Sequence, residues 1–219
     1  MISTLIYVVR HGHVADHQGD VAILPAGKRA AFDAGARLAD HLRDGGTATI
    51  LHAPTARTRE TAEELARGLE LTARAQNKNA ARIFAPRVEN AIRNFQFIIG
   101  GRDFPPTDAM HESLPASAEC DPFLNGFWQA TDDPIAYWLT HPSASAEAPA
   151  LVAERLREFF VATLARAPGF CVVITHSGPM RAFLRESLGA DPGEPDFCEA
   201  FLVRADGVRY RDQHGKLQI

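Results

Sequence analysis

The stretch from residue 5 to residue 13 constrains the fold of this chain more than any other. Five apolar residues in a row, 5–9, run directly into Arg10, His11 and Gly12. A continuous apolar run of this kind is typical of a strand that is buried on both faces, as in parallel sheets. Open α/β sheets bind ligands at the carboxyl ends of their strands. We therefore expect an arginine and a histidine at a ligand-binding edge, with Gly12 turning sharply and leaving backbone N–H groups open to a ligand.

Length, charge and cysteine usage exclude several classes of protein. The chain has 219 residues and a formal net charge of −4, which favours one domain of ordinary size and disfavours a general nucleic-acid binder. No apolar run reaches the length of a membrane span, and the first one lacks the basic leader of a signal peptide. The three cysteines have no CxxC spacing, so we expect reduced thiols in a cytoplasmic protein.

The alternation of apolar patterns predicts an α/β fold, three layers α/β/α, with a mixed, mostly parallel sheet. Strands are expected at 3–9, 47–51, 82–84 and 170–175, helices at 27–43, 54–71, 151–165 and 179–188, and an edge hairpin at 198–204 and 207–211. Prolines break the pattern between about 93 and 150, apart from a short helix near 125–140. We interpret this region as a helical and loop insertion over the active site, within a single domain that spans 1–219.

A second buried run repeats the arrangement of the first. The apolar residues 170–175 lead into His176, which Ser177 and Gly178 follow. If the two strands are parallel neighbours, His11 and His176 meet at the same edge of the sheet. A histidine in such a place can act as a nucleophile or as an acid or base.

Arg57 adds a second guanidinium group to this edge. Pro54 suits the first position of a helix, which places Arg57 in the first turn, pointing back at the sheet. Arg59 lies about 200° further round the helix and should face elsewhere. Two guanidinium groups and a helix N-terminus together form a cradle for phosphate.

These motifs, in this order, resemble the histidine phosphatase superfamily, which has the phosphoglycerate-mutase-like fold. The motifs are Arg10-His11-Gly12, Ala53-Pro54-Thr55-Ala56-Arg57 with Thr61-Ala62, a lone carboxylate at Glu89, and His176 after a buried strand. The resemblance implies metal-independent hydrolysis of phosphomonoesters, with no cofactor, through a phosphohistidine at His11. By the same resemblance, the phosphoryl group is bound by Arg10, Arg57 and His176, and the proton donor is Glu89. Asp16, Glu112 and Glu119 are alternatives for the proton donor.

The residues after the first motif depart from the family pattern. His13, Val14 and His17 stand where many relatives carry Glu or Gln, then Thr or Ser, then Asn. His17 is therefore expected on the phosphate side, and this segment is where a particular substrate, or a loss of activity, is expected to be encoded. Ala53 replaces the usual capping serine, which weakens the N-cap of the next helix. The features of glycolytic mutases are not evident, so we favour a phosphatase over a mutase.

Other hypotheses stay open. The pair His11 and His13, with His17 and His176 in reserve, is typical of some metal-dependent hydrolases, although Arg10 would repel the cation. A non-catalytic module that binds a phosphorylated ligand is the other alternative. Arg181 could face the pocket from the helix after His176, but we favour a charge on the surface of that helix. The expected partner is a phosphorylated small molecule, or else a phosphoprotein, with no nucleic acid and no membrane; the oligomeric state stays open.

Overall fold

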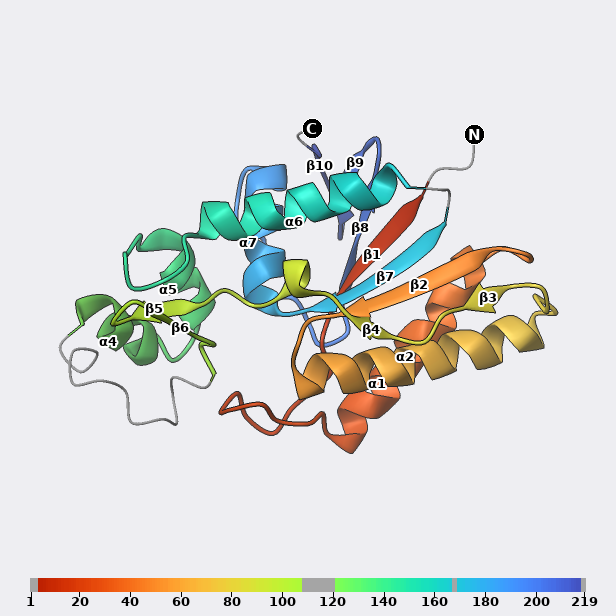
Figure 1. Cartoon of the computed structure of the whole chain (residues 1–219), viewed down its shortest axis with the longest axis horizontal. Helices are drawn as coiled ribbons and strands as arrows, with labels where there is room; N and C mark the ends of the chain where they lie inside the picture. Colours follow the sequence, from red (N-terminus) through yellow and green to blue (C-terminus); the bar gives the residue numbers. More distant parts are fainter. Residues whose placement is uncertain (1–3, 108–120, 167–168, 218–219) are drawn as a thin grey trace.

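The apolar run at the start of the chain forms the middle strand of an eight-stranded sheet (Figure 1). The computed structural model describes residues 4–107, 121–166 and 169–217. In it, β1 (Leu5–Arg10) pairs in parallel with β7 (Phe170–Thr175), and β7 pairs in parallel with β2 (Thr47–His52). Every residue of β7 is buried, as expected for a strand covered on both faces. The expected pairing of the two histidine-bearing strands is confirmed.

The remaining strands extend the sheet on both sides. The order is β10-β9-β8-β1-β7-β2-β3, and β4 also pairs with β2. These outer strands are β3 (Arg82–Ile83), β4 (Arg87–Val88), β8 (Ala200–Arg204), β9 (Gly207–Tyr210) and β10 (Gln213–Gly215). β3 and β4 join in parallel, whereas β8, β9 and β10 form an antiparallel edge. The mixed, mostly parallel sheet is therefore confirmed.

Helices cover both faces of the sheet, which completes the three predicted layers (Figure 1). One face carries α1 (Pro25–Leu38) and α2 (Ala56–Ala75), and the other carries α6 (Pro149–Leu164) and α7 (Ser177–Leu188). Each face has its own apolar core. The core under α1 and α2 includes Val9, Leu38, Ile50, Leu65 and Ile174. The core under α6 and α7 includes Val8, Leu156, Phe160, Val173 and Met180. Short 3₁₀ turns follow α1 at η1 (Ala39–His41) and β4 at η2 (Asn90–Ile92).

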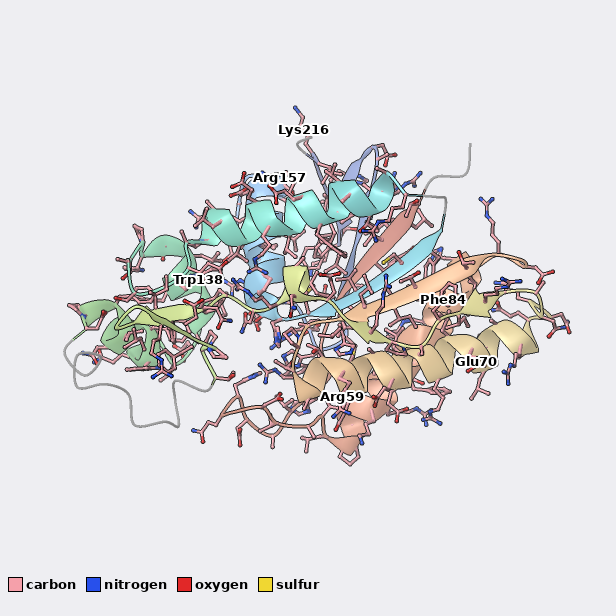
Figure 2. All side chains as sticks on the ribbon, in the orientation of Figure 1. Arg59, Glu70, Phe84, Trp138, Arg157 and Lys216 are labelled. Atoms are coloured by element: carbon pink, nitrogen blue, oxygen red, sulfur yellow. The ribbon has the colours of Figure 1, made fainter. Side chains whose placement is uncertain are left out.

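Two glycines let α1 and α2 pack backbone against backbone. A Cβ atom at Gly35 would lie 2.0 Å from the carbonyl oxygen of Leu65, and one at Gly68 would lie 2.1 Å from that of Phe32. Any larger side chain at either position would force the helices apart. The outer face of α2 carries charges, and Arg59 there pairs with Glu63, with an N–O distance of 3.8 Å (Figure 2). This agrees with the prediction that Arg59 faces away from the sheet edge.

The region between 93 and 150 contains more regular structure than the sequence indicates. It holds a hairpin of β5 (Phe97–Ile99) and β6 (Arg102–Phe104), followed by α4 (Pro122–Gln129) and α5 (Pro134–Thr140). We call these elements the cap. Their aromatic side chains share a third apolar core, in which the Phe95 ring stacks on that of Trp138 at 4.1 Å between centroids. The single helix expected near 125–140 is two helices, because the Asp133 side chain accepts from the Ala136 N–H and caps a new one.

The structure also bears on the expected start of the second long helix and on the expected state of the cysteines. The second long helix begins at Ala56, two residues after Pro54, because Thr55 is its extended N-cap residue. Cys171 and Cys198 are buried free thiols, whereas Cys120 lies outside the described residues. Among the helices that the structure describes, none combines the length and the apolar character needed to cross a membrane.

Candidate functional site

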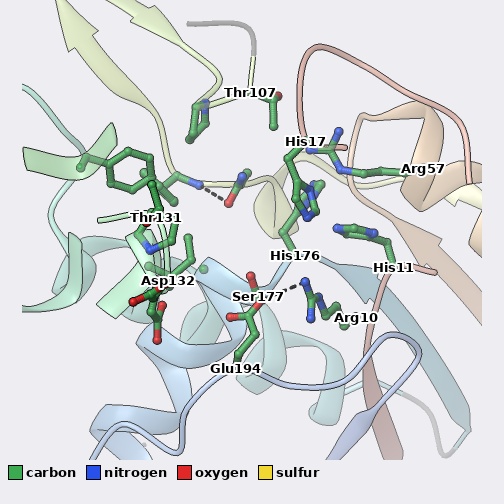
Figure 3. A pocket seen from close by; sticks show the side chains of 18 residues that line it. Arg10, His11, His17, Arg57, Thr107, Thr131, Asp132, His176, Ser177 and Glu194 are labelled. Atoms are coloured by element: carbon green, nitrogen blue, oxygen red, sulfur yellow. Dashed lines mark hydrogen bonds and ion pairs between the residues drawn. The ribbon is translucent and has the colours of Figure 1, made fainter. Parts of the chain in front are cut away.

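A pocket of about 320 Å³ opens at the carboxyl edge of the sheet, where β1 and β7 end (Figure 3). His11 and His176 both line it, and the centroids of their rings lie 5.3 Å apart. The parallel register of the strands explains this: Arg10 pairs with Thr175, so the next residue on each strand is a histidine. Arg10, Arg57 and His17 line the same pocket. The structure thus brings together five of the six predicted site residues.

The hydrogen bond of His11 defines its tautomer. Its Nδ1 atom lies 2.9 Å from the carbonyl oxygen of Gly12, which can only accept, so Nδ1 carries the proton. The lone pair is consequently on Nε2. Burial, and then the nearby Arg57 guanidinium, hold the pKa of His11 well below its ordinary value of 6.5. The same causes, in the same order, lower the pKa of His176. Both rings are therefore neutral at pH 7, which is the form in which imidazole is a nucleophile.

Gly12 holds the His11 backbone in place by close packing. A Cβ atom here would lie 2.9 Å from the Gly27 carbonyl oxygen at the start of α1. The Gly12 N–H donates to Thr61 Oγ1 at 2.9 Å, and the Thr61 hydroxyl donates to the Arg57 carbonyl oxygen at 2.6 Å. The expectation that Gly12 leaves its N–H open to a ligand is therefore wrong, because α2 supplies an acceptor that the local sequence does not show.

Arg57 reaches the pocket from the first turn of α2, as predicted. Its side chain is 1% exposed, and Nη1 donates to the Gly19 carbonyl oxygen at 3.3 Å. The first N–H of this helix, at Ala56, donates instead to the carboxylate of Asp20 at 2.6 Å. Asp20 therefore supplies from a distant loop the cap that Ala53 does not. Because the Ala56 N–H is already bonded to Asp20, α2 offers an anion the Arg57 guanidinium group rather than this N–H.

Arg10 is held from three sides. Nη2 lies 2.8 Å from Glu194 Oε1 (Figure 3). Nη1 donates to the Pro195 carbonyl oxygen, and Phe197 stacks against the guanidinium group at 4.1 Å. The side chain is buried, and its Nε atom has no hydrogen-bond partner among the described residues. Burial lowers the pKa of Arg10, and the Glu194 charge opposes this shift. The arginine is thus a buried, oriented donor on the wall of the pocket.

The unusual residues after Gly12 have separate places. His17 lies on the wall of the pocket, with its ring centroid 5.8 Å from that of His11, and burial followed by Arg57 lowers its pKa. His13 packs against Phe197 at 4.8 Å and is not part of the pocket lining. Val14 is buried and bridges to Ile23. Of these three residues, only His17 faces the site.

Glu89 is the predicted site residue that does not line the pocket. It follows β4 at the same edge of the sheet, where its N–H donates to the His52 carbonyl oxygen at 2.8 Å. Its Oε1 atom accepts from the Ala91 N–H at 3.0 Å and caps η2. Of the alternatives, Asp16 is exposed and accepts from the Gln18 N–H, whereas Glu112 and Glu119 lie outside the described residues.

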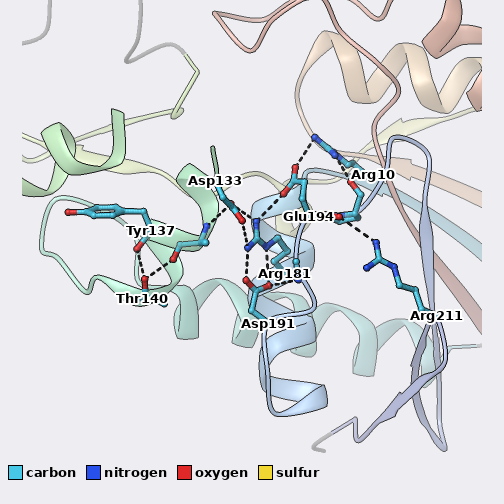
Figure 4. A network of polar contacts seen from close by, with 11 residues as sticks. Arg10, Asp133, Tyr137, Thr140, Arg181, Asp191, Glu194 and Arg211 are labelled. Carbon is cyan, nitrogen blue, oxygen red and sulfur yellow. Dashed lines mark hydrogen bonds and ion pairs between the residues drawn. The ribbon is translucent and has the colours of Figure 1, made fainter. Parts of the chain in front are cut away.

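Arg181 is not on the surface, so that interpretation of the sequence is wrong. Its side chain is 1% exposed, and it pairs with Asp133, Asp191 and Glu194 (Figure 4). Although burial by itself lowers the pKa of Arg181, hydrogen bonds to Asp191 and Asp133 raise it above the ordinary value. Asp133 and Glu194 also line the pocket, and sequence analysis missed both. Only the Asp-Pro pair at 133–134, a helix-start signal, marks either of them in the sequence.

The described residues contain no group of three His, Cys, Asp or Glu side chains placed to hold a metal ion. Of the pair His11 and His13, only His11 lines the pocket, although the rings of both lie near that of Phe197. What the pocket does offer is a neutral imidazole Nε2 beside two arginines and a second histidine, which suits an anion with a transferable group.

Comparisons with known proteins agree with this geometry. The model of the histidine phosphatase superfamily (branch 1) matches residues 6–78, which include Arg10, His11 and Arg57. A search of curated proteins found no match. Solved structures share the fold over nearly the whole chain. The structure of mycobacterial hydrolase 1 is 15% identical, with 98% of each chain covered and a TM-score of 0.60.

Two other structures have similar scores. A mycobacterial glucosyl-3-phosphoglycerate phosphatase in complex with VO3 is 17% identical, with 98% of this chain and 99% of that chain covered and a TM-score of 0.59. A protein from Thermus thermophilus is 20% identical, with 96% of each chain covered and a TM-score of 0.53. At these identities the structures establish the fold alone. The family model matches the segment that carries the first histidine and both arginines, so in this segment the chain is similar to the histidine phosphatase superfamily, and the solved structures show that it shares their fold.

Proposed function

We propose that this protein hydrolyses phosphomonoesters without a metal ion, through a phosphohistidine on Nε2 of His11. The observation that carries the proposal is the His11 hydrogen bond to Gly12, since it leaves the Nε2 lone pair unprotonated in a pocket lined by Arg10, Arg57 and His176. The match of residues 6–78 to the superfamily model and the fold shared with a phosphatase support the same activity.

In the first step, Nε2 of His11 attacks phosphorus, the N–P bond forms, and the P–O bond to the leaving alcohol breaks. Arg10 and Arg57 neutralise the charge on the phosphoryl oxygens, which is the main requirement of phosphoryl transfer. In the second step, water attacks the phosphohistidine, phosphate leaves, and Nε2 regains its electron pair. His176, neutral and buried, donates a hydrogen bond to a phosphoryl oxygen.

We retain Glu89 as the proposed proton donor to the leaving oxygen. It follows β4 at the edge of the sheet that carries His11, although it lies outside the pocket wall. A donor in that place delivers its proton through a water molecule or after its bond to the Ala91 N–H opens. The same carboxylate then accepts a proton from the water that attacks phosphohistidine.

We further propose that the substrate is a phosphorylated small molecule. A cavity of about 320 Å³ has the size of a small-molecule site. Structures of a mycobacterial glucosyl-3-phosphoglycerate phosphatase hold VO3 or inorganic phosphate, which supports the same class of ligand. The cap contributes Phe127 and Ile135 to the pocket wall. We therefore regard the chain as one domain in which the cap, between 93 and 150, selects the leaving group.

The test is trapping of the phosphoenzyme with a labelled generic phosphomonoester. We expect the wild-type protein to take up label that acid releases and base does not, and His11→Ala to lose both label and turnover by at least about a thousandfold. His214→Ala, at an exposed site in β10, is the matched control and should keep both. Turnover that survives in His11→Ala would refute the mechanism, and loss of activity in a chelator would favour the metal-dependent alternative.

A further inference from the structure

A buried arginine outside the pocket is linked to the arginine inside it. Arg181, on α7, donates from Nε to Asp191 Oδ1 at 3.0 Å and from Nη1 to Asp133 Oδ1 at 2.6 Å. Its Nη1 atom also lies 3.1 Å from Glu194 Oε2. Three carboxylates thus share one guanidinium group that is 1% exposed: Asp133 lies at the start of α5, and Asp191 and Glu194 lie in the loop after α7 (Figure 4).

Glu194 connects this arginine to the site. Its Oε2 atom accepts from Arg181, and its Oε1 atom lies 2.8 Å from Nη2 of Arg10. One carboxylate therefore bridges two arginines, of which one lines the pocket and the other does not. Asp133 connects the same arginine to the cap, because its Oδ1 atom also accepts from the Ala136 N–H at the start of α5.

We propose that Arg181 is a positioning residue that orients Arg10 through Glu194 and holds the start of α5 through Asp133. The proposal rests on the proposed function only in giving Arg10 the task of binding the phosphoryl group. Arg181 itself touches no substrate. Arg181 affects the affinity of the pocket for phosphate, because its ion pair with Glu194 weakens the ion pair between Glu194 and Arg10.

The physical reason is competition for one carboxylate. With Arg181 present, Glu194 divides its charge between two guanidinium groups. Without it, Glu194 keeps its ion pair with Arg10, and the carboxylate competes directly with phosphate for that cation. Asp133 and Asp191 also lose the partner that neutralises them, and like charges left close together repel each other. Lysine replaces the charge of Arg181 only partly, because an ammonium group lacks the planar fork that meets two carboxylates at once.

The experiment measures the Kd of inorganic phosphate by calorimetry for Arg181→Gln, Glu194→Gln and the double variant. We expect Arg181→Gln to raise the Kd about tenfold, the change that one charged hydrogen bond is worth. In the Glu194→Gln background, the same substitution should raise it less than about threefold, because the link between the arginines is already absent.

The matched control is Arg185→Gln, one turn further along α7. Arg185 also joins α7 to α5, by donating to the Leu139 carbonyl oxygen, and this bond does not involve Glu194. Its substitution should leave the Kd within about twofold of the wild type. If Arg181→Gln does not fold, Arg181→Lys is measured in its place. We expect it to raise the Kd of phosphate by a smaller factor, and we expect this rise to be absent in the Glu194→Gln background.

Two results would overturn the inference: an unchanged Kd in the Arg181 variants, or a rise of equal size with and without Glu194. The second would show that Arg181 does not act through Glu194. Failure of the proposed function is separate, since it appears as turnover in His11→Ala whatever the phosphate affinity.

Discussion

The two histidines of the site combine near-complete burial with neutrality. His11 is 2% exposed and His176 is 3% exposed, and both lie close enough to Arg57 for its charge to disfavour protonation. A histidine in such surroundings keeps its lone pair in mildly acidic solution. The arrangement that keeps both imidazole rings neutral therefore also makes the folded protein sensitive to acid.

Stability should fall as the pH drops below about 6.5. There the unfolded chain protonates both histidines, whereas the folded chain, with lowered pKa values, does not. Each histidine then costs about 1.4 kcal/mol of unfolding free energy per pH unit, until its folded pKa is reached. Urea unfolding at pH 7.5 and 5.5 measures this slope.

Two substitutions separate these histidines from the rest of the protein. His11→Gln and His176→Gln should each flatten the pH dependence by removing one titrating ring, whereas His214→Gln, at an exposed site in β10, should not. An unchanged slope in both buried variants would show that other groups govern the acid sensitivity.

At the scale of elements, α2 holds the end of β1. Thr61 accepts from the Gly12 N–H and donates to the Arg57 carbonyl oxygen, so one hydroxyl ties the turn after His11 to the turn that carries Arg57. The close contact between Gly12 and Gly27 adds α1 to this frame. The spacing between His11 and Arg57 is therefore a property of helix packing rather than of either loop.

Replacing Thr61 by valine should damage both stability and catalysis. The shape is conserved, but the buried Gly12 N–H loses its acceptor, at a cost of about 1–3 kcal/mol in unfolding free energy. The turn after His11 is then free to shift, so we expect kcat to fall while the Kd of phosphate changes less.

Thr163→Val provides the matched control. The Thr163 hydroxyl is buried on α6 and has no hydrogen-bond partner among the described residues. The same substitution there should leave the unfolding free energy unchanged or raise it. Equal losses at the two positions would mean that the bond to Gly12 contributes nothing.

At the scale of the whole molecule, the pocket is lined both by residues at the edge of the sheet and by residues of the cap (Figure 3). The sheet edge provides His11, His176 and the arginines, while Phe95 belongs both to the pocket wall and to the apolar core of the cap. A ligand that occupies the pocket therefore contacts residues of both the sheet edge and the cap. Ligand binding should consequently be visible in global unfolding.

Inorganic phosphate should raise the melting temperature. At a concentration of about 100 times its Kd, a ligand that binds only the folded state adds about 2.7 kcal/mol. For a chain of this size that is a shift of about 5–10 °C in differential scanning calorimetry. Arg57→Gln should abolish most of the shift.

Arg59→Gln is the control for this measurement, because it lies on the same helix and pairs outward with Glu63. It should keep the full shift. A full shift in Arg57→Gln would place phosphate elsewhere on the protein.

The order of the elements and the core of the site follow from local sequence. The runs before His11 and His176 each identify a buried strand from consecutive residues alone, and Pro54 marks the start of the next helix to within two residues. Strand period and helix capping are properties of neighbours in the chain. For that reason the sheet layers and the meeting of His11, His176, Arg10 and Arg57 were all predictable.

Only the tertiary structure decided what surrounds those four residues. The β5–β6 hairpin has strands of three residues each, too short to show a period of two. In the sequence, nothing distinguishes Arg181 from an exposed charged residue of a helix. Its partner Asp133 lies 48 positions away and is identified only by the fold. Likewise the acceptor for the Gly12 N–H comes from Thr61, 49 positions away. The packing of segments that are distant in the sequence determines these partners. A buried charge is stable only when that packing places opposite charges beside it.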